Sequence, residues 1–234
     1  MSTSINNHHL DAHSMAYIIM FWEGLGNLFP WNAFITASAY FATRFCGTAF
    51  ETNFENYFSI CFMAAQTAGL IIAVKYGRLL SLRTRIIYPL FWYSTVFALT
   101  TMFVVYKSFD ADTLFYVTLL STVICGVCGA ILSSGLFGLA AVMPPVYTGA
   151  VMNGQGMAGL TVSLASVFTI LARAPEDTCS DDNAVEDSCE YEVDYSALAY
   201  FLIATVALLT CVVVFEILCK LPFTHFHLAR SGNK

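Results

Sequence analysis

Charged residues are scarce in this sequence. Only 11% of the 234 residues are Asp, Glu, Lys or Arg, whereas 58% are hydrophobic, and the mean hydropathy is +0.68. Soluble globular domains carry about 25% charged residues, so this composition excludes an ordinary water-soluble domain. It predicts a polytopic membrane protein embedded in a lipid bilayer.

The motifs of common enzyme classes are also missing. The chain has no phosphate-binding Gly-Lys-Ser/Thr, no His-Glu-x-x-His and no nucleophile elbow. We therefore expect no enzyme, no cofactor and no metal. His9 and His13 have the spacing of two metal ligands on a helix, but a disordered polar tail explains them better.

Two targeting signals are missing as well. No basic segment precedes the first apolar run, which argues against a cleaved signal peptide, and no Asn-x-Ser/Thr glycosylation sequon occurs. The net charge of −6 is local, because nine of the 16 acidic residues fall between Glu176 and Asp194. Nucleic acid is not expected as a partner.

Six apolar runs are each about 20 residues long or longer, which is the length that crosses roughly 30 Å of hydrocarbon. They are Ala16–Tyr40, Tyr57–Leu80, Ile86–Tyr106, Thr113–Val142, Tyr147–Ala172 and Ser196–Cys219. The sequence thus predicts an all-α lobe of six transmembrane helices over residues 16–219, with tails at 1–15 and 220–234. Residues 173–195 would form an acidic loop.

Basic residues orient these helices, because cytoplasmic loops are enriched in Lys and Arg. Seven fall on one side: Lys75, Arg78, Arg83, Arg85, Lys220, Arg230 and Lys234. Only Arg44, Lys107 and Arg173 fall on the other. We therefore expect an integral membrane protein with both termini in the cytoplasm and the acidic loop outside.

Eight cysteines divide by environment. Cys179 and Cys189 lie in the solvated acidic loop, where the sequence predicts a disulfide between them. The others are interpreted as packing residues: Cys46, Cys61, Cys125, Cys128, Cys211 and Cys219. Cys125 and Cys128 have redox spacing but lie in an apolar helix.

Two carboxylates occur within the apolar runs. Glu23 lies near the start of the first run, and a carboxylate in a membrane is a functional candidate, here for proton coupling. The alternative is that it reaches the headgroups or pairs with a basic loop residue. Glu216 has Lys220 one turn on, which predicts a local ion pair.

The segment from Gly126 to Gly159 is apolar but rich in small and polar residues. Small side chains recur at every fourth position and predict a helix-packing face: Gly126, Ala130, Ser134 and Gly138. Asn153 and Gln155 lie about 10 Å inside the next run, where lipid offers no hydrogen bonds. They should face protein or a watery cavity.

The first run contains Pro30 flanked by Asn27, Trp31 and Asn32. A proline frees a backbone carbonyl within the helix, and such groups are tolerated where they line a cavity or meet neighbouring helices. If the six runs form two inverted triplets, the first and fourth correspond. Interrupted helices in corresponding positions indicate a transporter binding site.

Several strings together resemble the equilibrative nucleoside transporter family, in order and spacing, over nearly the whole chain. They are FPWNAFITA at 29–37 with Tyr40–Phe41, SLRTR at 81–85, GAIL at 129–132, GLFGLA at 135–140, Tyr147–Thr148 and GQGMAGL at 154–160. The resemblance implies eleven spans related to the major facilitator fold, six in an N-terminal lobe and five in a C-terminal lobe. It also implies passage of nucleosides or nucleobases by alternating access, with proton coupling in some members.

On the family pattern, Leu28, Trp31 and Asn32 would contact substrate, with Met63 and Gln66 facing them from the second span. An indole suits an uncharged base, although Trp31 could instead only pack between helices. Ser133 stands where the family commonly has a glutamine, and its shorter hydroxyl offers fewer hydrogen bonds.

Three glycines, Gly129, Gly154 and Gly159, match family glycines and are expected to let the fourth and fifth helices approach.

Two functions follow from the resemblance. The chain is either the N-terminal lobe of a nucleoside transporter, or a non-transporting membrane protein that acts in assembly or regulation of full-length relatives. A plasma-membrane location is expected in both cases. The first function requires a missing C-terminal lobe or a partner chain, because alternating access needs two lobes.

Overall fold

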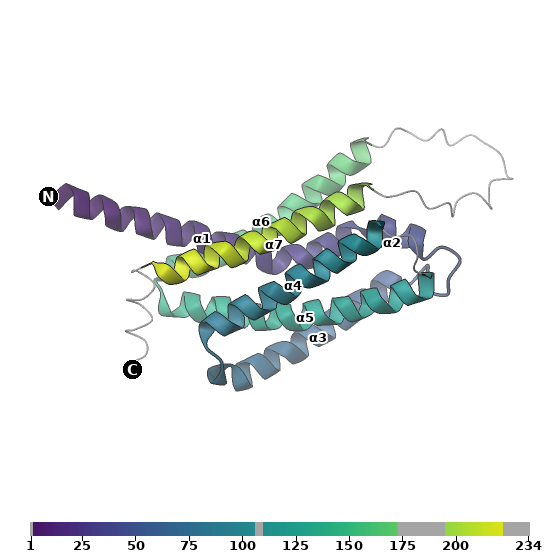
Figure 1. Ribbon diagram of the computed structural model, residues 1–234, viewed down its shortest axis with the longest axis horizontal. Coiled ribbons are helices and arrows are strands. Elements are labelled where there is room, and N and C mark those ends of the chain that lie inside the picture. The colour runs from purple at the N-terminus through teal and green to yellow at the C-terminus, as the bar shows by residue number, and fades with distance from the viewer. Residues whose placement is uncertain (1, 106–109, 173–194, 222–234) are drawn as a thin grey trace.

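Six long helices form one elongated bundle in the computed structural model, which describes residues 2–105, 110–172 and 195–221. Within these residues the chain forms helices and no strands. The elements are α1 (Ser2–Thr36), α2 (Ser38–Arg44), α3 (Phe54–Tyr76), the 3-10 turn η1 (Gly77–Leu79), α4 (Leu82–Val105), α5 (Ala111–Val142), α6 (Pro145–Ala172) and α7 (Tyr195–Lys220). The beginning of α1 and the end of α7 lie at the same end of the bundle (Figure 1).

Each predicted apolar run corresponds to one long helix, except that the first run breaks at Ala37 between α1 and α2. Four helical segments in the described residues are long and apolar enough to cross a membrane: α3, α4, α5 and Ala197–Lys220 of α7. Helices α1 and α6 are not among them. In α1 the apolar run itself contains Glu23, Asn27 and Asn32, which lower its hydropathy.

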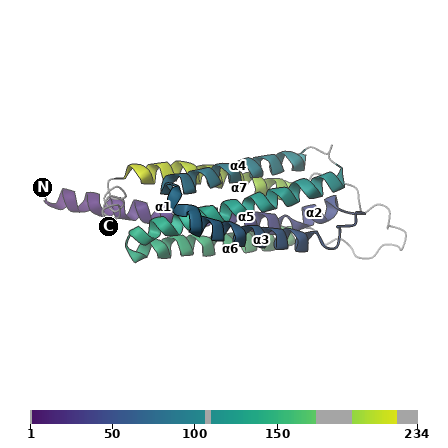
Figure 2. The same ribbon diagram turned by 90° about the horizontal axis from the view of Figure 1, so that it is seen from below.

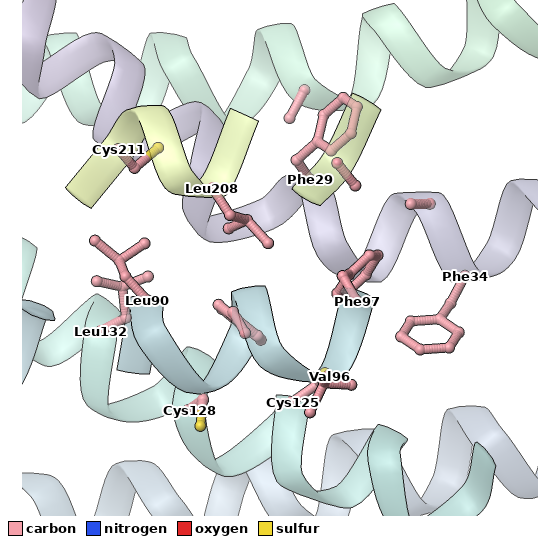
Figure 3. Close-up of a cluster of buried hydrophobic side chains, with 14 of the residues drawn as sticks. Phe29, Phe34, Leu90, Val96, Phe97, Cys125, Cys128, Leu132, Leu208 and Cys211 are labelled. Carbon is pink, nitrogen blue, oxygen red and sulfur yellow. The ribbon is translucent and has the colours of Figure 1, made fainter. Parts of the chain in front are cut away.

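The helices lie in three layers (Figure 2). Helices α4 and α7 form one side, α3 and α6 the other, and α1 and α5 run between them. Helix α1 packs along α6, and α5 packs along both α3 and α4. The core between α1, α4, α5 and α7 is filled by Phe29, Leu90, Phe97, Leu132 and Leu208, all buried (Figure 3). This arrangement places the side chains of α1 and α5 at the centre of the bundle.

Glycines set the crossing of α1 and α6. A Cβ atom at Gly24 would overlap the backbone carbonyl of Val151, and one at Gly154 would overlap the carbonyl oxygen of Phe21. The two backbones therefore touch directly, which only glycine allows. Gly154 was expected to admit the neighbouring helix α5, but its contact is with α1. At Gly159 no atom lies within 4 Å of an added Cβ, so it admits no close helix within the described residues.

The small-residue face of α5 is shared between two neighbours. A Cβ atom at Gly126 would lie 2.7 Å from the carbonyl oxygen of Phe62 on α3, whereas one at Gly138 would lie 3.3 Å from Leu82 on α4. Ala130 is buried, and its Cβ lies 3.0 Å from the position a Cβ would take at Gly69. The Ser134 hydroxyl donates to the carbonyl of Ile131 at 2.7 Å, within its own helix. The first half of the face packs on α3 and the last residue on α4.

Glu216 makes a different ion pair from the one predicted. Its two carboxylate oxygens accept hydrogen bonds from the Arg83 guanidinium at 2.7 and 2.8 Å, joining the end of α7 to the start of α4. The predicted local pair with Lys220 is wrong. One guanidinium nitrogen of Arg83 donates both hydrogen bonds, and tertiary packing brings it to Glu216 from another helix.

The interpretation of Cys46 as a packing residue is also wrong, because Cys46 is disulfide-bonded. Cys61, Cys125, Cys128, Cys211 and Cys219 are free thiols. The predicted Cys179–Cys189 pair lies outside the described residues. A bond from Cys46 to either of these cysteines would exclude that pair.

We expect Gly154→Ala to lower the free energy of unfolding by about 1–3 kcal/mol, because the new methyl group must push the α1 backbone away. Gly156→Ala is the matched control, two residues away on the same helix with nothing within 4 Å of an added Cβ. It should be neutral or slightly stabilising. Thermal unfolding in mild detergent measures both, and equal effects would contradict the crossing described here.

We further expect peptide mapping without reduction to recover Cys46 only in a cross-linked peptide. Cys61 and Cys219 are half-buried free thiols and serve as internal controls, which should be alkylated after denaturation without reductant. Recovery of alkylated Cys46 in the same digest would contradict the disulfide.

Candidate functional site

An aromatic stack joins α1 to α3 at one end of the bundle. The Trp31 indole lies on the Phe62 ring with centroids 4.1 Å apart and planes at 16°. Trp31 also borders a hollow of about 450 Å³, within the size range of small-molecule sites. The hollow is lined by Trp31, Phe34, Ile35, Ser38, Phe41, Phe54, Glu55, Asn56, Phe58 and Ser59. It combines a flat apolar wall with hydroxyl, amide and carboxylate groups.

A hydrogen bond joins α1 to α5 at the centre of the bundle. The Asn27 amide nitrogen donates to the Ser133 hydroxyl at 2.8 Å. Asn27 is buried and its carbonyl oxygen has no hydrogen-bond partner among the described residues, while Ser133 is half-buried. Ser133 therefore keeps its hydroxyl hydrogen for another acceptor.

Gln66 and Gly129 meet near a tyrosine that the sequence did not single out. A Cβ atom at Gly129 would lie 2.5 Å from the Tyr93 hydroxyl and 4.0 Å from the Gln66 amide nitrogen. Tyr93 is buried and belongs to α4. Its hydroxyl occupies the space that a side chain at position 129 would fill, and thereby reaches the contact between α3 and α5. Gly129 was expected to admit the fifth predicted span, but it makes room for this phenol instead.

The remaining predicted site residues differ in surroundings. Leu28 is partly buried against the core, and Met63 is 51% exposed on α3. Asn32 is half-buried, and its amide nitrogen is enclosed without a partner among the described residues. Of the six predicted substrate residues, only Trp31 lines the hollow. Of the others, Ser133 contacts Asn27 of α1, and the Gln66 amide lies beside Gly129 of α5.

Asn153 and Gln155 were expected to avoid lipid. The Asn153 amide is exposed at the α6 surface and donates to the Tyr17 hydroxyl at 3.4 Å. Gln155 is half-buried. Asn153 therefore contacts α1, as part of the α1–α6 packing.

Glu23 is fully buried, with 0% of its side chain exposed. Neither carboxyl oxygen has a hydrogen-bond partner among the described residues. The alternative interpretations, contact with headgroups or pairing with a basic loop residue, do not agree with this position. The candidate role in proton coupling therefore stays open.

Sequence reasoning missed Phe62 and Tyr93 as parts of this region. Both belong to uninterrupted apolar runs, in which no local pattern separates a residue that faces the site from one that faces the core. The sequence did indicate Asn27, since it lies in the same polar, proline-containing segment as Trp31.

We expect Gly129→Ala to lower the free energy of unfolding by about 1–2 kcal/mol, because its methyl group would displace the buried Tyr93 hydroxyl. Combining it with Tyr93→Phe should recover part of that loss, giving a coupling energy of about 0.5 kcal/mol or more. Gly149→Ala, where nothing lies within 4 Å, is the control. Additive effects in denaturant unfolding would show that the two positions do not touch.

The chain is similar to known transporters. A family model described as "Nucleoside transporter" matches residues 117–233. The chain is 29% identical to equilibrative nucleoside transporter 1 of Mus musculus, over 93% of this chain and 49% of the relative. It is 31% identical to equilibrative nucleotide transporter 1 of Arabidopsis thaliana, over 96% and 47%. It is 26% identical to equilibrative nucleoside transporter 1 of Homo sapiens, over 93% and 50%. The chain spans about half the length of the curated relatives it matches.

Proposed function

Because the chain belongs to the equilibrative nucleoside transporter family, we propose that it acts as the N-terminal lobe of a facilitative nucleoside or nucleobase transporter. Its long helices would provide six membrane spans, with α1 and α6 crossing alongside the four more apolar segments. Such a lobe would work by alternating access together with a second, C-terminal lobe.

The observation that carries the proposal is the hollow beside the Trp31–Phe62 stack. A nucleobase offers a flat, uncharged face, and stacking on an aromatic side chain is worth about 1–3 kcal/mol per base. Ser38, Asn56 and Ser59 line the same hollow and suit ribose hydroxyls. We therefore assign the base to Trp31 and the sugar to the polar wall.

The other substrate contacts would come from the residues along α1, α3 and α5. Leu28 and Met63 supply apolar surface, and the Asn32, Gln66 and Ser133 side chains supply polar groups. Glu23 is the candidate for coupling to protons.

The surface of the bundle supports the proposal of a second lobe. Apolar side chains are exposed along α3, including Ile60, Ile71 and Val74, and they suit lipid or another helix. Gln66 on the same helix is half-buried and would meet lipid if nothing covered it. A C-terminal lobe, on a longer chain or a separate one, would cover that side. The lobe pair would resemble the major facilitator arrangement.

The orientation and location also belong to the proposal. Both termini would be cytoplasmic in the plasma membrane, in accord with the Lys and Arg distribution.

A second candidate function is assembly or regulation of full-length relatives without transport. It is favoured by the exposed apolar side chains of α3, including Ile60, Ile71 and Val74, which suit binding to a helix of a relative. The six long helices pack into one bundle, as a chain that binds a partner would require.

The test is uptake of labelled uridine and adenosine in nucleoside-transport-deficient cells. We expect no saturable uptake from the chain alone and saturable uptake from the chain fused to the C-terminal lobe of a relative. In the fusion, Trp31→Ala should raise the apparent KM about tenfold, the equivalent of about 1.4 kcal/mol of lost stacking.

Trp92→Ala is the matched control, because Trp92 is 51% exposed on α4 and lies outside the hollow. Saturable uptake by the chain alone, at equal surface expression, would remove the need for a second lobe. An unchanged KM in the Trp31→Ala fusion would show that Trp31 only packs between helices. Increased uptake by a co-expressed full-length relative, with none from the fusion, would favour the regulatory function.

A further inference from the structure

Glu23 lies in a position that a charged carboxylate does not tolerate. The side chain is 0% exposed, and both oxygens lack hydrogen-bond donors among the described residues. Burial of an ionised carboxylate without a cation or donors is strongly unfavourable. A neutral carboxylic acid avoids most of that cost, but its O–H group then requires an acceptor.

No cation faces this carboxyl from the described parts of the helices packed against α1. On α6 the one titratable side chain is Tyr147, whose hydroxyl is hydrogen-bonded to His13. On α7 the Cys211 thiol donates to the Trp22 carbonyl at 3.6 Å, and Glu216 is held by Arg83. None of the other described titratable groups on α1 and on these helices donates a hydrogen bond to Glu23. They include Tyr17, Tyr40, Arg44, Asp112, Tyr116, Cys125, Cys128, Tyr200 and Lys220.

An acceptor for the carboxyl proton lies one helical turn along. Asn27 follows Glu23 at the i, i+4 spacing that places two side chains side by side on a helix. Its amide nitrogen already donates to Ser133 at 2.8 Å, and its carbonyl oxygen is buried without a donor. Three adjacent acceptor oxygens, two on Glu23 and one on Asn27, thus lack any hydrogen among the described residues.

We propose that Glu23 is a proton-binding site at the head of a hydrogen-bond chain from Glu23 to Asn27 to Ser133. A single proton taken up from water removes the charge and supplies a donor for the Asn27 carbonyl oxygen. The carboxyl O–H donates to the Asn27 carbonyl oxygen, and the Asn27 amide donates to the Ser133 hydroxyl. Ser133 then has its own hydroxyl hydrogen available for another acceptor.

Release of the proton from Glu23 changes these hydrogen bonds. The carboxylate and the Asn27 carbonyl oxygen become two acceptors that repel each other. The Asn27 side chain can relieve the repulsion by turning its amide nitrogen towards Glu23, which breaks its bond to Ser133. The proton on Glu23 therefore decides which hydrogen bonds Ser133 makes. Its effect on transport rests on the proposed function, whereas the proton site itself does not.

The first experiment is infrared difference spectroscopy of the chain in lipid nanodiscs at neutral pH. The wild-type protein should show the carbonyl stretch of a protonated carboxylic acid, and Glu23→Gln should lose it. Asn27→Leu should shift this band to higher wavenumber, because the acid loses its acceptor. Glu51→Gln is the control, because Glu51 is exposed and its carboxylate accepts a hydrogen bond from the Gly47 amide. It should leave the band unchanged.

Absence of the band in the wild-type protein would overturn the proton site, and a band unmoved by Asn27→Leu would overturn the hydrogen-bond chain. Should Glu23→Gln not fold, titration of the band in the wild-type and Asn27→Leu proteins decides the same two points. Neither measurement depends on transport.

The second experiment is uptake by the fusion with a C-terminal lobe, measured across a range of external pH in cells. The wild-type fusion should show pH-dependent uptake, and Glu23→Gln should abolish that dependence while Glu51→Gln retains it. Equal pH dependence in the wild-type and Glu23→Gln fusions would overturn the coupling to transport. Lack of uptake by every fusion would instead count against the proposed function and leave the infrared result standing.

Discussion

The direct backbone contact between α1 and α6 is the constraint on which the rest of the bundle depends. At Gly24 and Gly154 the two helices approach more closely than any side chain would permit. In a bilayer this kind of packing replaces the hydrophobic effect as the force that joins helices. With one side of α1 fixed against α6, its other sides must face α5 and α7. The polar residues of α1 are therefore held inside the bundle.

The helices could be predicted from the sequence because each is a separate apolar run, whereas their partners could not. Glu216 shows why. A pattern along one chain segment favours Lys220, four residues on, but α4 brings Arg83 to the same place from more than 130 residues away. Gly154 and Cys46 were misinterpreted for the same reason. Small side chains and thiols show that a contact is suitable, but only the tertiary arrangement shows with which element it is made.

The candidate site was predictable in part. The polar segment around Pro30 identified α1 as the polar helix, although α1 continues through Pro30 without a break. The structure brings Trp31 to Phe62 and Asn27 to Ser133. Tyr93 had no such signal, because a tyrosine inside an apolar run resembles any other core residue. Glu23 could be singled out because a carboxylate is rare in an apolar run. Its burial could not be predicted, since a side chain near the start of such a run can usually reach water.

The contact between Tyr93 and the space above Gly129 also constrains how this protein can change through evolution. The two positions share one volume, so a side chain gained at 129 must be matched by one shortened at 93. Helix α4 belongs to an outer layer of the bundle, yet it occupies a position beside Gln66 on α3. Substitutions at Tyr93 on α4 can therefore change the shape of the space between Gly129 and Gln66 without altering either of these residues. Relatives that differ in ligand preference should show paired changes in size at these two positions.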